Sequence, residues 1–214
     1  MNADELVQRN VVLLPSGIVE EQALRYSRQL AERFATEFLL SPQFVAHCSL
    51  YQAAYPQRNA KRVKEVVQVI AKGFRPFQVS MNGFGIFWHT FVFWDADKSE
   101  DLRRLHHGLL EALNPLREQQ LLPIHQQLLT DVQIPAPLRE SIRDYGNPLA
   151  GDQERPHMTL TRLKDARDAD LALERLQATA DPTGAMCFEA TMLYLTEVGP
   201  HGTCPRLLDG FPLG

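Results

Sequence analysis

Apolar and polar residues follow two different spacings along this chain, and these spacings predict a series of strands and helices. From Asn10 to Leu14 the chain is uniformly apolar after its first residue and ends at a Pro-Ser-Gly turn, which indicates a short buried strand. From Ile18 to Phe38 apolar residues recur every three or four positions among charged ones. That spacing is typical of an amphipathic helix. The chain is therefore expected to begin with a strand followed by a helix.

The same interpretation covers most of the remaining sequence. Helices are predicted from Asn59, a candidate N-cap, to Gly73, from Ser99 to Leu113, and from Asp168 to Ala178. Strands are predicted at Phe44 to Tyr51, in two parts of Pro76 to Trp94 joined at Asn82-Gly83, at His157 to Leu163, at Met186 to Val198 and at Pro205 to Pro212. Helices and strands mixed in this order predict an α+β fold.

The segment from residue 116 to residue 156 contains five prolines between its polar and apolar stretches and shows no sustained spacing. Short helices are predicted around 119–130 and 137–145. We interpret the segment as an insert or a lid over a cleft, within a single domain that spans residues 1–214.

Composition is that of an ordinary globular protein. The 214 residues are 44% hydrophobic and 22% charged, enough apolar material for one core or for two closely joined lobes. No apolar run has the length of a membrane span, and no charged-then-apolar leader begins the chain. The three cysteines lack Cys-x-x-Cys spacing, which argues against a disulfide framework and a zinc cluster. A cytoplasmic location and no membrane partner are expected.

Net charge narrows the class of partner. The chain carries a formal charge of −4, whereas proteins that follow a long nucleic-acid backbone usually have a basic excess. An extended nucleic-acid surface is therefore not expected. A nucleotide, a short RNA end or another small phosphoester fits better.

Two tetrapeptides of one design carry the candidate chemistry, His47-Cys48-Ser49-Leu50 and His157-Met158-Thr159-Leu160. With 7 histidines in the chain, the pattern His-x-Ser/Thr-Leu should occur by chance only roughly 0.1 times. Both copies lie where strands are predicted. Alternate strand residues share a face, so each histidine projects with its hydroxyl residue while the other two residues project behind the sheet.

Two imidazoles and two hydroxyls that converge on one small volume form a phosphate-sized site. A neutral imidazole can accept a proton from an attacking water or hydroxyl, and an imidazolium can donate one to a departing oxygen. Hydroxyl groups can donate hydrogen bonds to the non-bridging phosphate oxygens. This chemistry requires no metal ion and no cofactor, and none is expected.

The motif pair resembles that of the 2H phosphoesterases, which include the 2′-5′ RNA ligases, also called RNA 2′,3′-cyclic phosphodiesterases. The resemblance implies a bilobal fold in which two pseudo-symmetric lobes, with antiparallel-type sheets and helices outside, surround a central cleft. It implies metal-independent opening of a 2′,3′-cyclic phosphate, or hydrolysis or ligation of a related phosphodiester. It also implies that His47, Ser49, His157 and Thr159 are the catalytic residues.

Three further residues are candidates for binding substrate: Tyr51, Arg162 and Tyr194. In a regular strand Arg162 would face away from His157, so a bulge would be needed to turn it inward. Other histidines are expected to be structural. His106 is expected to face solvent beside its histidine neighbour, and His201 with Cys204 lacks partners for a metal site.

The sequence thus predicts a monomeric phosphodiesterase that acts on 2′,3′-cyclic nucleotides or RNA ends, with 2′-5′ ligation as a related activity. We expect one histidine to act as base and the other as acid, with a weak preference for His157 as the base. The alternative is a non-catalytic module that binds a nucleotide or phosphate with the same fold. A metal-dependent hydrolase would need a carboxylate and histidine cluster, which the sequence lacks.

Overall fold

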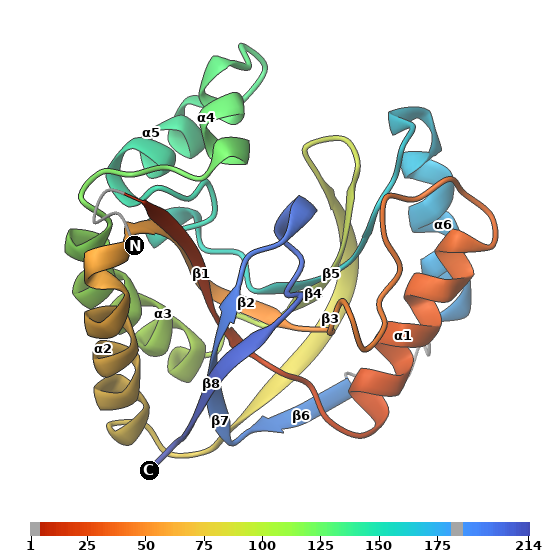
Figure 1. Ribbon diagram of the computed structural model, residues 1–214. Helices are drawn as coiled ribbons and strands as arrows, with labels where there is room; N and C mark the ends of the chain where they lie inside the picture. Colours follow the sequence, from red (N-terminus) through yellow and green to blue (C-terminus); the bar gives the residue numbers. More distant parts are fainter. Residues whose placement is uncertain (1–4, 181–185) are drawn as a thin grey trace.

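The computed structural model describes residues 5–180 and 186–214. Its strands form one antiparallel sheet in the order β6-β3-β4-β5-β2-β1-β7-β8 (Figure 1). The strands are β1 (Leu6–Leu13), β2 (Cys48–Pro56), β3 (Phe77–Phe87), β4 (Phe91–Ala96), β5 (His157–Arg162), β6 (Met186–Ala190), β7 (Met192–Glu197) and β8 (Leu207–Pro212). The helices are α1 (Ile18–Ala31), α2 (Ala60–Lys72), α3 (Glu100–Leu113), α4 (Pro123–Thr130), α5 (Ala136–Tyr145) and α6 (Ala169–Thr179). The α+β class predicted from the sequence is confirmed.

The sheet consists of two four-stranded halves. The first half-sheet is β2-β1-β7-β8, and the second is β6-β3-β4-β5. They meet where β2 pairs with β5 through one register pair, Cys48 with Met158. Each half therefore supplies one motif strand, and the two motifs lie at the seam between the halves.

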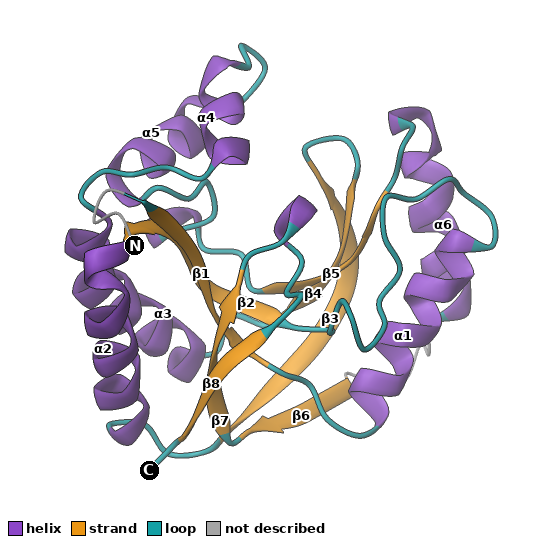
Figure 2. Ribbon diagram, viewed as in Figure 1, coloured by secondary structure: helices purple, strands orange, loops and turns teal. Residues whose placement is uncertain are grey.

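The larger helices cover the outer sides of the two halves. Helices α2 and α3 pack against strands of the first half-sheet, and α1 and α6 pack against the second (Figure 2). Helix α3 shows how the local sequence produces this arrangement. Its N-cap Ser99 accepts a hydrogen bond from the Leu102 amide at 3.2 Å, and its buried leucines recur at helical spacing. The two halves thus form two lobes with helices outside, as predicted.

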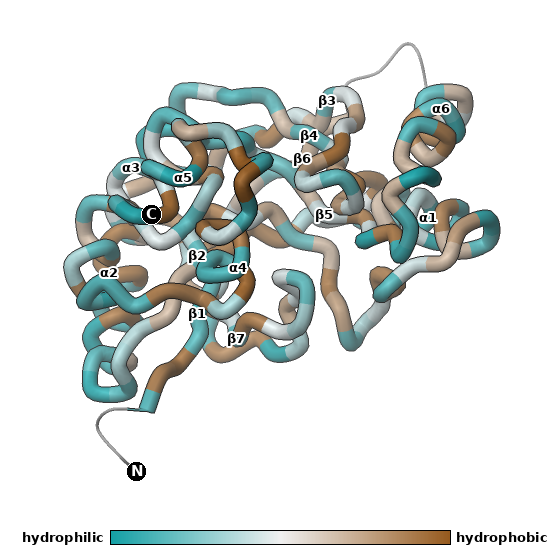
Figure 3. Tube along the Cα trace, turned by 90° about the horizontal axis from the view of Figure 1, so that it is seen from above, coloured by the Kyte–Doolittle hydropathy of each residue, from teal (hydrophilic) through white to brown (hydrophobic). Residues whose placement is uncertain are grey.

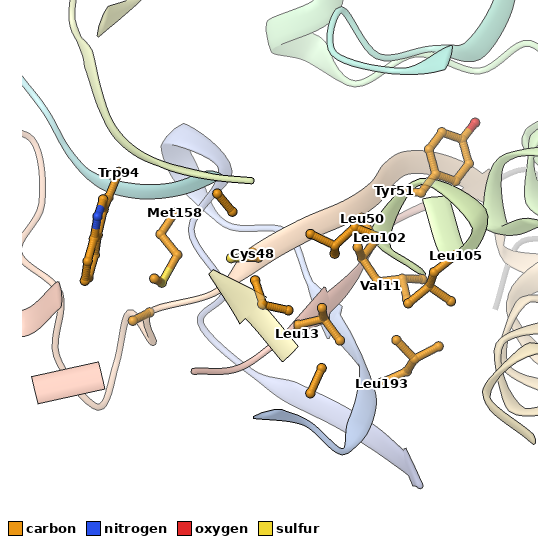
Figure 4. Close-up of a cluster of buried hydrophobic side chains, with 14 of the residues drawn as sticks. Val11, Leu13, Cys48, Leu50, Tyr51, Trp94, Leu102, Leu105, Met158 and Leu193 are labelled. Atoms are coloured by element: carbon orange, nitrogen blue, oxygen red, sulfur yellow. The ribbon is translucent and has the colours of Figure 1, made fainter. Parts of the chain in front are cut away.

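One continuous apolar core connects both lobes. Figure 4 shows Cys48 and Met158 in this core beside Leu13 and Trp94, so the residues behind the motif histidines point into the core. Hydrophobic and hydrophilic residues alternate within the outer helices (Figure 3), as expected when one face of a helix packs on the sheet and the other faces solvent. Within the described residues, no helix combines the length and apolarity needed to cross a membrane.

The boundaries predicted for the first helix and for the first motif strand were wrong. Helix α1 ends at Ala31, and residues 35–37 pair instead with the end of β5, with the Glu37 amide donating to the Arg162 carbonyl at 2.8 Å. Phenylalanines at helical spacing continued the pattern, but pairing with β5 outweighs this local preference. The motif strand β2 begins at Cys48, after a turn, and continues to Pro56.

Three other predictions need correction. Asn82-Gly83 is not the turn of the hairpin but lies inside β3 at a register shift, and the turn falls at residues 88–90. The strand expected from Met186 to Val198 is two strands on different half-sheets, because β6 pairs with β3 whereas β7 pairs with β1. Continuous apolar alternation cannot reveal such a change of partner. Asn59 precedes α2, but its side chain makes no cap hydrogen bond. Its amide donates to the Leu116 carbonyl at 2.7 Å and thereby joins α2 to the chain after α3.

The segment 116–156 contains α4 and α5, which were expected at nearly these positions, and a small apolar cluster of its own around Leu128, Ile134 and Ile142. Trp88, at the tip of the β3–β4 hairpin, packs against this cluster. The Trp88 indole Nε1 also donates a hydrogen bond to Asp131 Oδ2 at 2.9 Å. The segment is therefore attached to the hairpin of the second half-sheet.

Candidate functional site

The register at the seam brings the two motifs together. Cys48 lies opposite Met158 in an antiparallel pair. Continued by one residue in each direction, this register sets His47 opposite Thr159 and Ser49 opposite His157. Opposite residues of an antiparallel pair have Cβ atoms about 5 Å apart. Each histidine thus has the hydroxyl residue of the other motif beside it.

Each motif strand also contains a β-bulge, at the same position of the motif. Val11 and Val12 of β1 pair with Tyr51 and Ser49, so Leu50 is an extra residue in β2. Val92 and Phe93 of β4 pair with Thr161 and Thr159, so Leu160 is an extra residue in β5. The extra residue is the fourth of each motif. Because a bulge inverts the alternation that follows it, the residue two places later turns to the side of the histidine.

That bulge is the one needed to bring Arg162 to the site. Its guanidinium lies 4.9 Å from the Phe91 ring centroid, donates from Nε to Thr90 Oγ1 at 3.2 Å and approaches His201 Nδ1 at 3.0 Å. Phe91 and His201 both line the main cleft. Gln52 occupies the equivalent place after the first motif and also lines the cleft.

The imidazoles are held by the same local contact. His47 Nδ1 lies 2.8 Å from the carbonyl oxygen of Val45, and His157 Nδ1 lies 2.6 Å from that of Arg155. A carbonyl oxygen can only accept, so in both rings Nδ1 carries the hydrogen. In the neutral ring this tautomer leaves Nε2 as the basic nitrogen.

The environments of the two histidines shift their pKa values in opposite directions. Burial lowers the pKa of His157 to about 4, and the charges of Arg155 and His47 act in the same direction. The hydrogen bond with the Arg155 carbonyl and the charge of Asp95 oppose this shift but do not cancel it. Burial also disfavours the charged form of His47, yet attraction to Cys204 and hydrogen bonding to Cys204, Val45 and Gly202 outweigh burial and raise its pKa.

A cleft of about 760 Å³, including its open mouth, lies over the seam. Ser49, His157 and Thr159 line it, together with residues of the hairpin, α4 and the chain near His201. His47 lies in an adjoining hollow of about 200 Å³, and Thr159, His201 and Gly202 line both spaces. The charges of the two imidazoles interact across this boundary. Both predicted histidines thus belong to one site, with His47 at its more buried end.

An aromatic wall forms one side of the cleft: Phe87, Trp88, Phe91 and Phe93. The ring of Phe93 stacks on His157 with centroids 3.6 Å apart and planes 20° from parallel. The Arg155 guanidinium lies 5.2 Å from the Phe93 centroid and forms two hydrogen bonds of 2.8 Å with Asp95. This stack fixes the orientation of the His157 ring.

Gly85 gives Arg155 the space for this position. A Cβ atom at residue 85 would lie 2.0 Å from Arg155 Nη2 and 3.2 Å from Asp95 Oδ2. Sequence analysis singled out neither Arg155 nor Gly85. Their roles depend on the register of β3 with β4, which differs from the one that a turn at Asn82-Gly83 would give.

Two of the candidate substrate-binding residues have hydroxyl groups that already have partners within the fold. Tyr51 lines the cleft but is 1% exposed, and its hydroxyl donates to the Tyr145 carbonyl at 2.7 Å, so that hydroxyl joins β2 to α5. Tyr194 lines a separate hollow beside Glu20 and Glu189, where its hydroxyl donates to Met192 Sδ at 3.3 Å. The signal in the sequence that points to Gln52 as a cleft residue is the symmetry of the motifs, because Gln52 is the counterpart of Arg162.

One histidine outside the motifs differs from expectation, and another lines the cleft. His106 is buried rather than solvent-facing: its Nδ1 lies 2.7 Å from the Leu50 carbonyl, and its Nε2 accepts from the Gly151 amide at 3.1 Å. His125 of α4 lines the cleft, and its Nδ1 lies 2.6 Å from the Gly146 carbonyl. Among the described residues there is no group of three or more histidine, cysteine or acidic side chains arranged to hold a metal ion.

Comparisons with known proteins agree with this fold. The family model described as the 2′-5′ RNA ligase superfamily matches residues 22–198. The structure of TT0787 from Thermus thermophilus is similar, with a TM-score of 0.59 and 16% identity over 96% of this chain and 97% of that one. The structure of E. coli LigT complexed with 3′-AMP has a TM-score of 0.54 and 14% identity over 98% of each chain. The structure of Kluyveromyces marxianus Usb1 has a TM-score of 0.50 and 12% identity over 96% of this chain and 98% of that one. No curated protein matches the sequence.

Proposed function

The chain belongs to the 2′-5′ RNA ligase superfamily, a branch of the 2H phosphoesterases, and from this premise we propose that it hydrolyses the 2′,3′-cyclic phosphate of a nucleotide or of a short RNA end. The observation that carries the proposal is the convergence of the two motifs at the seam, where Ser49, His157 and Thr159 line one cleft and His47 lies in the adjoining hollow. The opposite directions of the two histidine pKa shifts agree with it. Paired titratable groups whose environments separate their pKa values are suited to act as an acid and a base at the same pH.

His157, neutral because burial lowers its pKa, is the general base in this proposal. It accepts a proton from water as the water oxygen forms a bond to phosphorus. His47, whose pKa is raised, is the general acid. It donates a proton to the 2′ or 3′ oxygen as the bond from that oxygen to phosphorus breaks. One water is consumed, a ring-opened phosphomonoester forms, and exchange with solvent restores both rings.

Ser49 and Thr159 supply hydroxyl groups beside the opposite histidine, and we assign them to the non-bridging phosphate oxygens. Their hydrogen bonds strengthen as negative charge develops on those oxygens. Arg162 stands at the rim of the same cleft, where a guanidinium can neutralise part of the phosphate charge. Removal of either hydroxyl should reduce kcat more than it raises KM.

The aromatic wall supports a nucleoside as the remainder of the substrate. Flat rings such as Trp88 and Phe91 offer stacking surfaces for a base, and stacking tolerates different bases. The net charge of −4 disfavours a long polymer. LigT, a structural relative, has been solved with 3′-AMP, with phosphate and with ATP, all of which are small phosphate compounds. We therefore propose a mononucleotide or a terminal nucleotide as the substrate, and a monomeric enzyme in the cytoplasm.

The test is a panel of four nucleoside 2′,3′-cyclic phosphates and a cyclic-phosphate-ended oligonucleotide, each assayed with and without EDTA. Products are resolved as 2′ or 3′ phosphomonoesters, and ligation is assayed with a 5′-hydroxyl oligonucleotide. We expect turnover that EDTA does not reduce. His47→Ala and His157→Ala should each lower kcat by about 10² or more. Ligand binding without turnover on any of these substrates would instead support a nucleotide-binding module.

A further inference from the structure

A buried polar cluster lies behind the first motif. It consists of Asn10 in β1, Thr196 in β7 and Cys204 in the segment before β8, and we call it the rear cluster. Asn10 and Thr196 are 0% exposed, and Cys204 is 2% exposed. The Thr196 hydroxyl lies 3.1 Å from Cys204 Sγ, and the Asn10 amide nitrogen lies 3.9 Å from the same sulfur. The cluster is therefore a connected group.

The rear cluster contacts both functional groups of the first motif. Asn10 Nδ2 donates a hydrogen bond to Ser49 Oγ at 2.7 Å. His47 shares a hollow with Gly202 and Thr203, which directly precede Cys204, and the charge of the Cys204 sulfur acts on the His47 imidazole. One group of side chains on β1 and β7 thus supports the hydroxyl and the imidazole assigned to catalysis.

The cluster is a poor arrangement for stability alone. Among the described residues, Asn10 Oδ1 is the buried side-chain oxygen or nitrogen without a hydrogen-bond partner. A buried polar atom without a hydrogen-bond partner destabilises the fold, whereas an apolar side chain of the same size would not do so in this way. An unfavourable polar residue beside a candidate active site is expected when the residue serves that site.

We propose that Asn10 and Cys204 are positioning residues for the first motif, with Asn10 orienting the Ser49 hydroxyl and Cys204 holding the His47 imidazole. This inference rests on the proposed function, because it concerns how the assigned acid and phosphate donor are set in place. Neither residue lines the cleft, so neither is expected to touch substrate.

For Ser49 the physical reason is the direction of the hydrogen bond. A hydroxyl has one hydrogen and two lone pairs. Because Ser49 Oγ accepts from Asn10, one lone pair is occupied on the buried side, and the hydroxyl hydrogen is left for a partner in the cleft. A phosphate oxygen is such a partner.

For His47 the reason is stabilisation of its charged form. The groups that face it are Cys204, His157 of β5 and His201, which itself lies between Arg162 and Glu37. The charge of His157 is repulsive to an imidazolium. Cys204 attracts it, and the donors from Asn10 and Thr196 that surround the sulfur favour negative charge there. Cys204 thus keeps His47 available as an acid despite burial.

The first experiment measures the His47 pKa by NMR titration of its ring nitrogens, and in parallel the pH dependence of kcat/KM. We compare Cys204→Ala, the conservative Cys204→Ser, and the control Cys48→Ala. Cys48 is another buried thiol, 1% exposed, adjacent to His47 in sequence but directed into the core. Cys204→Ala should lower the His47 pKa and move the alkaline limb of the profile to lower pH. Cys204→Ser should restore part of the shift, and Cys48→Ala should cause none.

The second experiment is a double-mutant cycle between Asn10 and Ser49. Asn10→Leu, or Asn10→Ala if the first variant does not fold, should lower kcat about tenfold when Ser49 is present. In a Ser49→Ala background the same change should have almost no effect, because Asn10 acts through the missing hydroxyl. Additive losses would overturn this role of Asn10.

The two experiments separate this inference from the proposed function. An unchanged His47 pKa in Cys204→Ala, or an equal change in Cys48→Ala, overturns the inference while turnover by the wild type leaves the function intact. Absence of turnover overturns the function, and the NMR titration still decides whether Cys204 controls His47.

Discussion

Leu50 of β2 and Leu160 of β5 are equivalent residues: each is the fourth residue of a motif and the extra residue of a bulge. Both are buried, so each anchors its motif strand in the core. After each bulge the next residue is also buried, and its hydroxyl donates to a distant carbonyl, Tyr51 to Tyr145 and Thr161 to Phe38. The symmetry of the motifs therefore extends beyond the four residues that define them.

This symmetry predicts unequal roles for Arg162 and Gln52, which follow the two bulges. Of the two side chains, only that of Arg162 carries a positive charge that can compensate the charge of a phosphate. We expect Arg162→Gln to raise KM about tenfold or more, since hydrogen bonds with charged groups contribute about 1.5–3 kcal/mol. Gln52→Ala should raise KM less. Steady-state kinetics on a 2′,3′-cyclic nucleotide measures both values, and an equal effect would contradict the assignment.

The pH–rate profile should be broad and asymmetric about neutrality. kcat/KM should fall below the His157 pKa of about 4, where the base becomes protonated, and above the His47 pKa, which is raised from 6.5, where the acid loses its proton. A nucleoside 4-nitrophenyl phosphate provides the control, because its leaving group needs no protonation. With that substrate the alkaline limb should disappear and His47→Ala should lose little activity. An unchanged alkaline limb would mean that His47 is not the acid.

Gly85→Ala tests the stack that orients His157. The new Cβ would lie 2.0 Å from Arg155 Nη2, and a flexible guanidinium can move away at little cost to folding. Arg155 would then leave Asp95 and the face of Phe93. We expect kcat to fall about tenfold while the thermal midpoint changes little. Arg155→Ala should give a similar loss, and the double variant should lose no more than either single variant.

The motifs and the elements around them could be predicted from the sequence because they depend on local patterns. His47, Ser49, His157 and Thr159 were identified by a repeated spacing, and the structure brings them to one seam. The exchange of strand partners between β6 and β7, the bulges and the stack on His157 depend on pairing across long sequence separations. A local pattern contains no information about a distant partner, so Asn10, Arg155 and Cys204 could not be found in it.

The contact between Trp88 and Asp131 attaches the segment 116–156 to the β3–β4 hairpin. Trp88→Phe and Asp131→Ala remove the same hydrogen bond from its two ends. Either change should raise KM about threefold and speed amide hydrogen exchange in α4, while exchange in the central strands stays unchanged. The two changes together should have no larger effect than one. Unaltered exchange in α4 would show that the apolar contact of Trp88 is sufficient to hold the segment.

His125 should make the stability of the protein depend on pH. Burial lowers its pKa to about 4, whereas the pKa in the unfolded chain is close to 6.5. As pH falls below 6.5 the unfolded chain binds a proton that the folded protein excludes, so the free energy of unfolding decreases until pH approaches 4. The loss attributable to this histidine is up to roughly 3 kcal/mol. Urea unfolding at pH 7.5, 6 and 5 measures it. His125→Gln retains an amide that can donate to the Gly146 carbonyl and does not titrate, so its stability should decline less steeply over this range. Equal slopes for the two proteins would mean that the pKa of His125 is the same in the folded and the unfolded protein.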